Sequence, residues 1–600
     1  MNCSKTVTAR FFETSNELHV GPGQPYTIIQ DAVDAARPGA TIIVHDGVYT
    51  ENVKVDKSLD IRSENGSTAT IVQAASPDDH VFEVTANGVT LSGFAVENAS
   101  GSSKAGIYLN GADDCIITNN SASNNWCGIY LYESSSSTVS DNTSNDNSDM
   151  GIYIHYSSGN NISGNTANNN NYMGVYIHYS SGNTLNDNIA TSTKVGEGIH
   201  LVVSDNNTIG NSTINNNTSS GIYLFMSDSN TFVNNAIQDN GHGVHVVDSS
   251  GNWLVGNDIR NNDTEEGSGV HLNVIWTNVA DNHLLFNNIV DNSLGTSYGV
   301  YNETTDIVDA ILNWWGDASG PYYPTANPGG AGDRVSDRVA FEPWLGASVA
   351  AVEGRTTETG IDTIDATEKA HTEVIKAGAG TPTIWVAAHS DNPAGAFSAF
   401  SIGKWIDVHL DSAEDVEQIE IKLHYTPEEI NGLAESSLRL YWWNGSNWME
   451  CSDSGVNEVE DYIWARITAD STPSLNDVTG TPFAGGGQPY YALTANVSPG
   501  GSGTVTLEPS PPAEGYVGGT EATLTAVASE GYEFDHWSGS LSGSENPITI
   551  TMESEKELTA NFTELTSSPF PWWWIVVGVG VGVVVVVLLV YFLVIRGWRA

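Results

Sequence analysis

Apolar residues recur through the first half of the chain with a period of 22 to 24 residues. Each repeat opens with Gly, then Ile or Val, then Tyr or His, and another apolar residue follows eleven places after the glycine. A unit this short, with two or three β-forming stretches and no helical period, cannot bury its own apolar face. We therefore expect the repeats to stack. Their first residues are Gly106, Gly128, Gly151, Gly174, Gly198, Gly221, Gly243, Gly269 and Gly299, with longer steps at the end.

Winding the chain into coils buries the apolar faces, because every strand then pairs in parallel with its equivalents about 4.8 Å above and below. Equivalent side chains form rows along the stack. The sequence predicts an all-β chain in which residues 20–346 form a right-handed parallel β-helix of about 12 coils. Its expected inner row is Ile117, Val139, Ile162, Leu185, Ile209, Phe232 and Leu254.

An asparagine row accompanies the apolar one, fourteen places after the repeat glycine. Asparagine tolerates the left-handed backbone of a tight corner and can bond along a stack. We therefore interpret the row as structural. It contains Asn120, Asn142, Asn165, Asn188, Asn235 and Asn257, and Ser212 interrupts it.

A solenoid needs its open ends covered. Ile28, Val33 and Ala36 mark a short amphipathic helix that ends at Pro38-Gly39 and would cover the first coil. Residues 1–19 have no apolar core of the length that a signal peptide needs, so we expect a disordered segment or a truncated start.

The second half predicts two β modules and a membrane anchor. Residues 355–484 show strand-like runs separated by turns, which favours a β-sandwich-like module. A smaller β module follows at 488–563, and residues 564–571 form a linker. Residues 572–595 carry no charge and are long enough to cross a hydrocarbon core of about 30 Å. Arginines in the tail, 596–600, place the tail in the cytoplasm and the bulk of the chain outside, at the cell surface.

The composition limits the kinds of partner that the chain can bind. The chain has 72 acidic and 21 basic residues, a formal charge of −51, so nucleic acid is excluded for want of clustered basic residues. About fifteen Asn-x-Ser/Thr sequons are compatible with an exported glycoprotein. Cys115 and Cys127 are near enough in sequence to pair in an oxidising compartment, or they are buried small hydrophobes.

A column of aromatic and imidazole side chains is the candidate functional surface. If the residue after each repeat glycine points inward, the next one points outward, and so does the residue two places further on. Such rings, flanked by hydroxyls and amides, favour an elongated glycan-binding surface. Alternatively, the rings stack between coils and only stabilise the sheet. The candidate ligand-binding residues are Tyr130, Tyr132, Tyr153, His155, Tyr176, His178, His200, Tyr223, His245 and His271, in line with Tyr108 and Tyr301.

A second interpretation of the Tyr/His column is that its histidines bind a metal ion. His155, His178 and His200 fall in adjacent coils, and neutral imidazoles about 5 Å apart can share Cu²⁺ or Zn²⁺. No pair has a diagnostic spacing, and no carboxylate completes a tetrahedral set. We therefore assign no metal ligand and expect no cofactor, with Ca²⁺ or Cu²⁺ as the ions to consider.

The N-terminal part of the chain carries a family resemblance. A helix, the segment PGATIIVHDGVYTENVKVDKSL and the Gly-Ile-Tyr coils resemble the pectate-lyase-like β-helices of the periplasmic copper-binding NosD family and related carbohydrate-binding surface proteins. The resemblance covers about residues 20–346. The segment GYEFDHWSG at 531–539 and Ala560-Asn561-Phe562 resemble the internalin B-repeat-type, or bacterial repeat, module. Such modules resemble spacers or adhesion units.

Enzymes of this fold give a test for catalysis. Pectate-type lyases resemble one another in using Asp-bound Ca²⁺ with an Arg or Lys base, yet the few basic residues of the coils, Lys104, Lys194 and Arg260, have no acidic cluster in the repeat alignment. Two fragments resemble motifs of polygalacturonases, Asp113-Asp114 and Gly241-His242-Gly243. About six coils separate them, which corresponds to a distance of roughly 29 Å. Carboxylates that act on one glycosidic bond must lie within about 10 Å. No catalytic residue is assigned.

The sequence thus predicts a membrane-anchored extracellular binding, adhesion or envelope protein whose partners are a cell-envelope or extracellular polysaccharide and, through residues 572–595, the lipid bilayer. One alternative is a membrane-tethered polysaccharide-modifying enzyme, a lyase, hydrolase or epimerase. A second is a copper-binding, NosD-like protein.

Overall fold

The computed structural model describes residues 16–262, 267–276, 279–293, 295–397 and 399–566. The predicted membrane helix at 572–595, the tail at 596–600 and most of the linker at 564–571 lie outside the described residues. Within the described part, no helix is long and apolar enough to span a membrane. The chain divides into two compact units. One holds the β-helix and the module up to residue 486, and the other holds the C-terminal module with residues 431–437.

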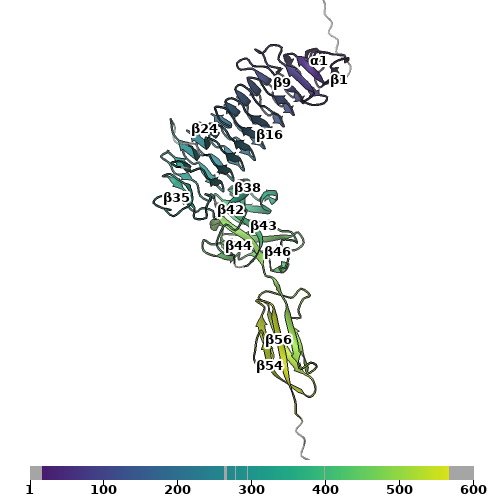
Figure 1. Cartoon of the computed structure of the whole chain (residues 1–600), viewed down its shortest axis with the longest axis vertical. Coiled ribbons are helices and arrows are strands. Elements are labelled where there is room, and N and C mark those ends of the chain that lie inside the picture. Colours follow the sequence, from purple (N-terminus) through teal and green to yellow (C-terminus); the bar gives the residue numbers. More distant parts are fainter. Residues whose placement is uncertain (1–15, 263–266, 277–278, 294, 398, 567–600) are drawn as a thin grey trace, which may run out of the picture. The chain divides into compact units, whose positions relative to one another are not determined.

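The first half is a parallel β-helix of about 12 turns, as predicted (Figure 1). Its strands form three stacks, because each coil contributes one strand to each face. The face that carries the Tyr/His column is an 11-stranded parallel sheet, the stripe sheet. Its strands are β4 (Val53–Val55), β7 (Phe82–Val84), β10 (Ala105–Asn110), β13 (Cys127–Tyr132), β15 (Met150–His155), β18 (Met173–His178), β21 (Ile199–Val202), β24 (Ser220–Phe225), β27 (His242–Val247), β30 (Ser268–Asn273) and β33 (Tyr298–Asn302).

The longest face is a 14-stranded sheet. It contains β1 (Glu17–Val20), β2 (Thr41–Val44), β5 (Asp60–Ser63), β8 (Thr90–Ser92), β11 (Ile116–Thr118), β14 (Thr138–Ser140), β16 (Asn161–Ser163), β19 (Thr184–Asn186), β22 (Thr208–Gly210), β25 (Thr231–Val233), β28 (Trp253–Val255), β31 (His283–Leu285), β34 (Val308–Asp309) and β37 (Val339–Ala340).

The third face is divided into stacks of four and six strands. The first has β3 (Gly47–Thr50), β6 (Thr70–Gln73), β9 (Ala95–Glu97) and β12 (Ser121–Ala122), and the second has β17 (Thr166–Asn168), β20 (Ile189–Thr191), β23 (Thr213–Asn215), β26 (Ala236–Gln238), β29 (Asp258–Arg260) and β32 (Asn288–Val290). A short pair, β35 (Pro321–Tyr322) and β36 (Gly332–Arg334), lies near the end of the β-helix.

The predicted inner row is confirmed. All seven of its residues, from Ile117 to Leu254, are at most 1% exposed. They pair in register along the 14-stranded sheet, with Ile117 opposite Val139 and Val139 opposite Ile162. Burial of this row is the main reason the coils stack, because an apolar side chain gains about 1.5–3 kcal/mol when it leaves water.

The predicted asparagine row forms a hydrogen-bonded ladder inside the coils. The Oδ1 of Asn142 accepts hydrogen bonds from the backbone N–H and the side-chain amide of Asn120, at 2.9 and 3.1 Å. The Nδ2 of Asn142 donates to Ile117 O and to Asn165 Oδ1. Ser212 continues the row with its hydroxyl, which accepts a bond from the N–H of Asn188. Every member thus satisfies buried backbone groups at a corner.

One detail of the prediction is corrected. The left-handed residue at this corner is not the ladder asparagine but the residue before it, such as Asn119 (φ 57°), Asp141 (φ 55°) or Asp187 (φ 57°). Two further asparagine ladders, which the sequence analysis did not identify, occupy the other corners. They contain Asn160, Asn183, Asn207, Asn230, Asn252 and Asn282, and Asn125, Asn147, Asn170, Asn217, Asn240, Asn262 and Asn292.

A short helix covers the first coil. Helix α1 (Ile29–Ala35) buries Ile29, Ala32 and Val33. The β-helix begins earlier than predicted, because β1 pairs with β2 in parallel and Leu18 and Val20 are buried in the core. Part of the 1–19 segment that we expected to be disordered or truncated is therefore a strand.

The next module is built from two antiparallel sheets. Asn234 and Asn288 fix it to the β-helix, since their side-chain amides bond the backbone of Val352 and Val349. One sheet has β38 (Val349–Thr356), β41 (Thr383–His389), β42 (Phe400–Leu410), β48 (Thr479–Gly487), β44 (Arg439–Trp443) and β45 (Trp448–Glu450). The other has β39 (Asp362–Ala366), β40 (Thr372–Gly378), β43 (Val416–His424), β47 (Tyr462–Ile467) and β46 (Ser454–Asn457), with the short helices α2 (Thr367–Ala370) and η2 (Leu475–Asp477). The short helix η1 (Glu435–Ser437) belongs to the second compact unit.

The C-terminal module is a small β fold with its own core around Trp537, which is fully buried. Its strands are β49 (Tyr490–Tyr491), β50 (Leu493–Ser498), β51 (Gly503–Glu508), β52 (Tyr516–Val517), β53 (Glu521–Ala528), β54 (Tyr532–Gly539), β55 (Ile548–Thr551) and β56 (Lys556–Glu564). Among the cysteines that the structure describes, Cys115, Cys127 and Cys451 are free thiols and buried.

Candidate functional site: an aromatic stripe on the β-helix

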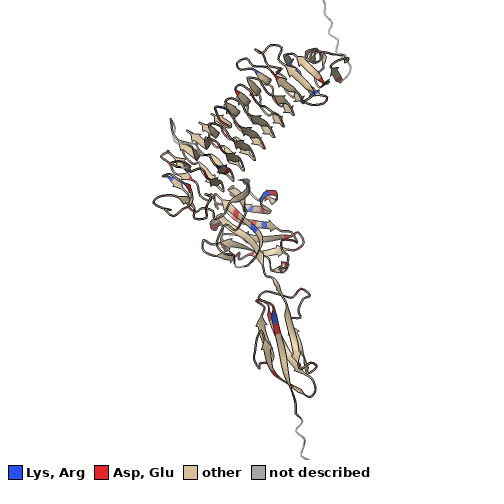
Figure 2. Ribbon diagram, in the orientation of Figure 1, with Lys and Arg blue, Asp and Glu red and all other residues tan. Residues whose placement is uncertain are grey.

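The Tyr/His column is continuous and in register along the stripe sheet. Tyr130 pairs with Tyr153, Tyr153 with Tyr176, and Tyr176 with His200. The column continues through Tyr223 and His245 to His271 and Tyr301. We call this column, with the neighbouring Tyr132, His155 and His178, the stripe. Most of the β-helix ribbon that carries it is neither acidic nor basic (Figure 2).

The rings of the stripe lie against one another instead of standing free in solvent. Tyr130 and Tyr153 stack with centroids 4.6 Å apart, and Tyr153 and Tyr176 stack at 4.9 Å, with interplanar angles of 15° and 9°. Tyr153 is only 8% exposed. The expectation that this column faces solvent therefore holds for ring edges and hydroxyls, whereas the ring faces are used for stacking.

Tyr132, His155 and His178 form a second column beside the first, and its histidines contact tyrosines of the first column one coil away. The hydroxyl of Tyr130 lies 3.2 Å from Nδ1 of His155, and that of Tyr153 lies 3.3 Å from Nδ1 of His178. His155 and His178 are themselves stacked, 4.9 Å apart. Tyr132 meets His155 edge to face. These contacts hold the imidazoles in fixed positions along the surface.

A third column, which the sequence analysis missed, exposes its rings. Tyr156 and Tyr179 are 49% and 45% exposed and stack on each other at 5.1 Å. Their backbones are left-handed, with φ of 49° and 48°, and this turns them out of the strand alternation. The alternation rule used to find the stripe therefore could not predict them, although their position directly after the second column was visible.

Burial favours the neutral forms of several stripe residues. It raises the pKa of Tyr176 to about 12 and raises the pKa of Tyr130 and Tyr153 further. Burial, with His155 and His200 nearby, lowers the pKa of His178 to about 4. At neutral pH the phenols and His178 are therefore neutral. A phenol both donates and accepts hydrogen bonds, and a neutral imidazole offers one donor and one acceptor.

Carboxylates and arginines lie along the C-terminal half of the stripe. Glu197 pairs with His200 at 3.4 Å, and Glu303 pairs with Nε2 of His271 at 3.2 Å. Beyond Tyr301 the surface is hollowed into a cavity of about 260 Å³. Its lining includes Tyr298, Tyr301, Glu303, Arg334 and Arg338.

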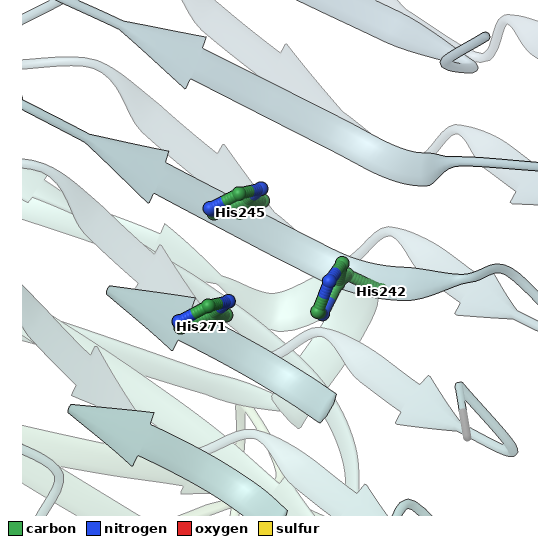
Figure 3. Close-up of side chains that lie close together, drawn as sticks. All are labelled: His242, His245 and His271. Carbon is green, nitrogen blue, oxygen red and sulfur yellow. The ribbon is translucent and has the colours of Figure 1, made fainter. Parts of the chain in front are cut away.

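The three histidines considered for metal binding are not brought together as one group. His155 and His178 share a column, but His200 belongs to the first column, where it pairs with Tyr176 and contacts its ring. A different group, His242, His245 and His271, brings one nitrogen from each residue within 4.8 Å of the others (Figure 3). Sequence reasoning noticed His242 only as part of Gly-His-Gly.

The fragments that imitate polygalacturonase stay apart. Asp113 and Asp114 follow β10, whereas Gly241-His242-Gly243 lies at β27, six strands along the stripe sheet. At strand spacing this is roughly 29 Å, too far for two groups that act on one bond. The aspartates and the Gly-His-Gly do not form a catalytic pair.

The fold and the stripe define a parallel β-helix protein with a long surface column of aromatic and imidazole rings. The family described as "Periplasmic copper-binding protein (NosD)" matches residues 33–209 and 170–287, and the "Divergent InlB B-repeat domain" matches residues 493–566. Both resemblances expected from the sequence are thus found.

Similar proteins include a cell surface glycoprotein of Methanothermus fervidus, 37% identical over 108 residues. The match covers 18% of this chain and spans 17% of that glycoprotein. Among solved structures, the A-module of a mannuronan C-5 epimerase of Azotobacter vinelandii has a TM-score of 0.40 at 17% identity, covering 48% of this chain and 88% of that module. The Dettilon tailspike protein has a TM-score of 0.36 at 13% identity, with coverages of 74% and 88%.

Proposed function

We propose that this chain is a cell-surface protein whose β-helix binds glycans along the stripe. The surface location is supported by the likeness to a cell surface glycoprotein and by the match to a family described as periplasmic. The uncharged segment at 572–595 would anchor the chain in the bilayer, with the β modules outside and the C-terminus in the cytoplasm. Both placements are part of the proposal.

The observation that carries the glycan proposal is the run of neutral phenols, with the neutral imidazole of His178, in a chain of net charge −51. Phenol and imidazole groups repeat coil after coil at the strand spacing of about 4.8 Å. They offer donors and acceptors without charge, which suits a ligand rich in hydroxyls. An elongated polymer, with groups that repeat along its length, fits such a surface better than a compact small molecule.

The stacked geometry also indicates how a sugar would bind. The ring faces of Tyr130, Tyr153 and Tyr176 are stacked on one another, so the contacts available there are hydroxyls and ring edges. Exposed ring surface is offered by Tyr156 and Tyr179, beside His155 and His178. We therefore expect hydrogen bonds along the first two columns and apolar contact of a sugar with the third.

A glycan array probed with the full chain tests this proposal. The change of both Tyr156 and Tyr179 to Ala should reduce the array signal by about 5- to 160-fold, since two aromatic contacts of about 0.5–1.5 kcal/mol each are lost. Tyr172→Ala is the matched control, because Tyr172 is 46% exposed and belongs to none of the three columns. Absence of any glycan ligand, or equal losses in both variants, would contradict the proposal.

A further inference from the structure

Three imidazoles converge on the stripe sheet where it nears its C-terminal end. His242 and His245 come from β27, and His271 comes from β30, the next strand. His245 and His271 are stacked, with centroids 4.7 Å apart and an interplanar angle of 2°. Figure 3 shows these two rings one above the other and His242 beside them, and the ring of His242 lies 5.1 Å from each.

The cluster has unused hydrogen-bonding capacity. Nδ1 of His271 and Nε2 of His245 are buried and make no hydrogen bond of normal geometry, although the side chain of Asn273 lies near His245. Buried polar atoms normally have a partner, so two unpaired ring nitrogens in one cluster require an explanation. Elsewhere in the stripe, the Nδ1 atoms of His155 and His178 face tyrosine hydroxyls. Nδ1 of His200 also has no hydrogen-bond partner and lies 3.4 Å from the carboxylate of Glu197.

A carboxylate already orients one of the rings. Glu303 Oε2 accepts a hydrogen bond from Nε2–H of His271 at 3.2 Å. This bond fixes the tautomer of His271 and leaves the lone pair on Nδ1, the atom without a partner. A carboxylate that holds the far nitrogen of an imidazole in this way is a recurrent partner of metal-binding histidines.

We propose that His242, His245 and His271 bind one first-row transition ion that prefers imidazole, Zn²⁺ or Cu²⁺, and that Glu303 is the positioning residue for His271. Three nitrogen ligands leave a coordination position open for water or for a ligand atom. Ca²⁺ does not suit this site, because it takes oxygen ligands. The site goes beyond glycan binding and does not depend on it.

Binding requires small side-chain rotations and the loss of one bond. With Zn–N bonds of about 2.0–2.1 Å, nitrogens of a tetrahedral site lie roughly 3.4 Å apart, so the rings of His245 and His271 must tilt out of their parallel stack. His242 Nδ1 accepts a 3.2 Å bond from the N–H of Ser268. A neutral ring has one lone pair, so ligation competes with this single bond. The paired backbones of β27 and β30 need not move.

Calorimetric titration of the full, tag-free chain with Zn²⁺, and separately with Cu²⁺, tests the site. One equivalent should bind, and Ca²⁺ in excess should not displace it. His242→Gln and His271→Gln should each abolish this equivalent, whereas His155→Gln, which changes a stripe histidine outside the cluster, should retain it. Glu303→Gln should weaken binding about 10–100-fold, as loss of a supporting carboxylate does.

Electron paramagnetic resonance of the Cu²⁺-loaded wild-type chain gives a readout that needs no variant, because nitrogen hyperfine splitting reports the imidazole ligands. The proposal is overturned if the wild type binds neither ion, if the spectrum shows no nitrogen ligand, or if His155→Gln removes the binding. Circular dichroism of each variant separates loss of the site from loss of the fold. Repeating the glycan array with a chelator keeps failure of this site distinct from failure of glycan binding.

Discussion

Two kinds of column run through the same coils, the asparagine ladders inside and the Tyr/His stripe outside. The ladder residue Asn165 is 1% exposed, and its side chain bonds Asn142, Val139 and Asn188. Tyr153 in the stripe is stacked on both sides, and its hydroxyl lies 3.3 Å from Nδ1 of a neighbouring stripe residue, His178. Both columns repeat equally well in the sequence.

The difference shows that repetition alone does not mark function. A ladder asparagine satisfies backbone groups that no water reaches, so its repetition follows from the fold. Stripe residues stabilise the sheet by stacking, and the hydroxyls of Tyr130 and Tyr153 contact His155 and His178. Because a phenol can both donate and accept, each of these hydroxyls retains capacity for one further hydrogen bond, to a ligand under the proposed function. Burial and hydrogen-bond satisfaction, rather than the period, separate structural columns from candidate functional ones.

The largest expected effect is a loss of folding stability when a ladder asparagine is removed. Asn165→Ala should lower the free energy of unfolding by roughly 2–6 kcal/mol, because the backbone N–H of Asn142 and the carbonyl of Val139 lose partners at about 1–3 kcal/mol each. Urea denaturation followed by circular dichroism measures it. Asn165→Ser, which imitates Ser212, should cost less. Equal losses for the two variants would show that the ladder bonds are not responsible.

A smaller gain is expected where the ladder is interrupted. Ser212→Asn restores the side-chain amide, whose equivalents at Asn188 and Asn235 donate to the carbonyls of Ile162 and Ile209. The free energy of unfolding should rise by about 0.5–1.5 kcal/mol, the net worth of one buried hydrogen bond. The same denaturation experiment measures it, and a loss of stability would show that the corner has no room for the amide.

The smallest effect concerns pH and the stripe. The folded-state pKa of His178 is about 4, below its ordinary 6.5. Between these values the unfolded chain takes up a proton that the folded chain does not, so this residue lowers stability as the pH falls from 6.5 to 4 and has no such effect above 6.5. His178→Gln should therefore make stability fall less over that window. Denaturation at pH 7, 5.5 and 4 checks this, and identical slopes would contradict it.

Much of the fold could be predicted from the sequence because the repeat fixes it. The repeat glycine, the inner row and one asparagine row were sufficient to predict the β-helix. The other two ladders, which include Asn160 and Asn170, also lie at regular distances from the repeat glycine, but the prediction did not use them. The exposed pair Tyr156 and Tyr179 could not be found by strand alternation, since a left-handed corner turns them outward. The cluster of His242, His245 and His271 was also not predicted. Two of its histidines lie three places apart on one strand, and the third lies on the strand of the next coil.

The measurement that tests the central claim most directly is glycan affinity after removal of three stripe hydroxyls. In the triple variant Tyr153→Phe, Tyr176→Phe, Tyr223→Phe the stacked rings remain, so the melting temperature should stay within a few degrees of the wild type. Affinity for a glycan identified on the array should fall at least about tenfold, since three neutral hydrogen bonds are worth about 0.5–1.5 kcal/mol each. Unchanged affinity in a folded variant would contradict the claim that the stripe binds the glycan.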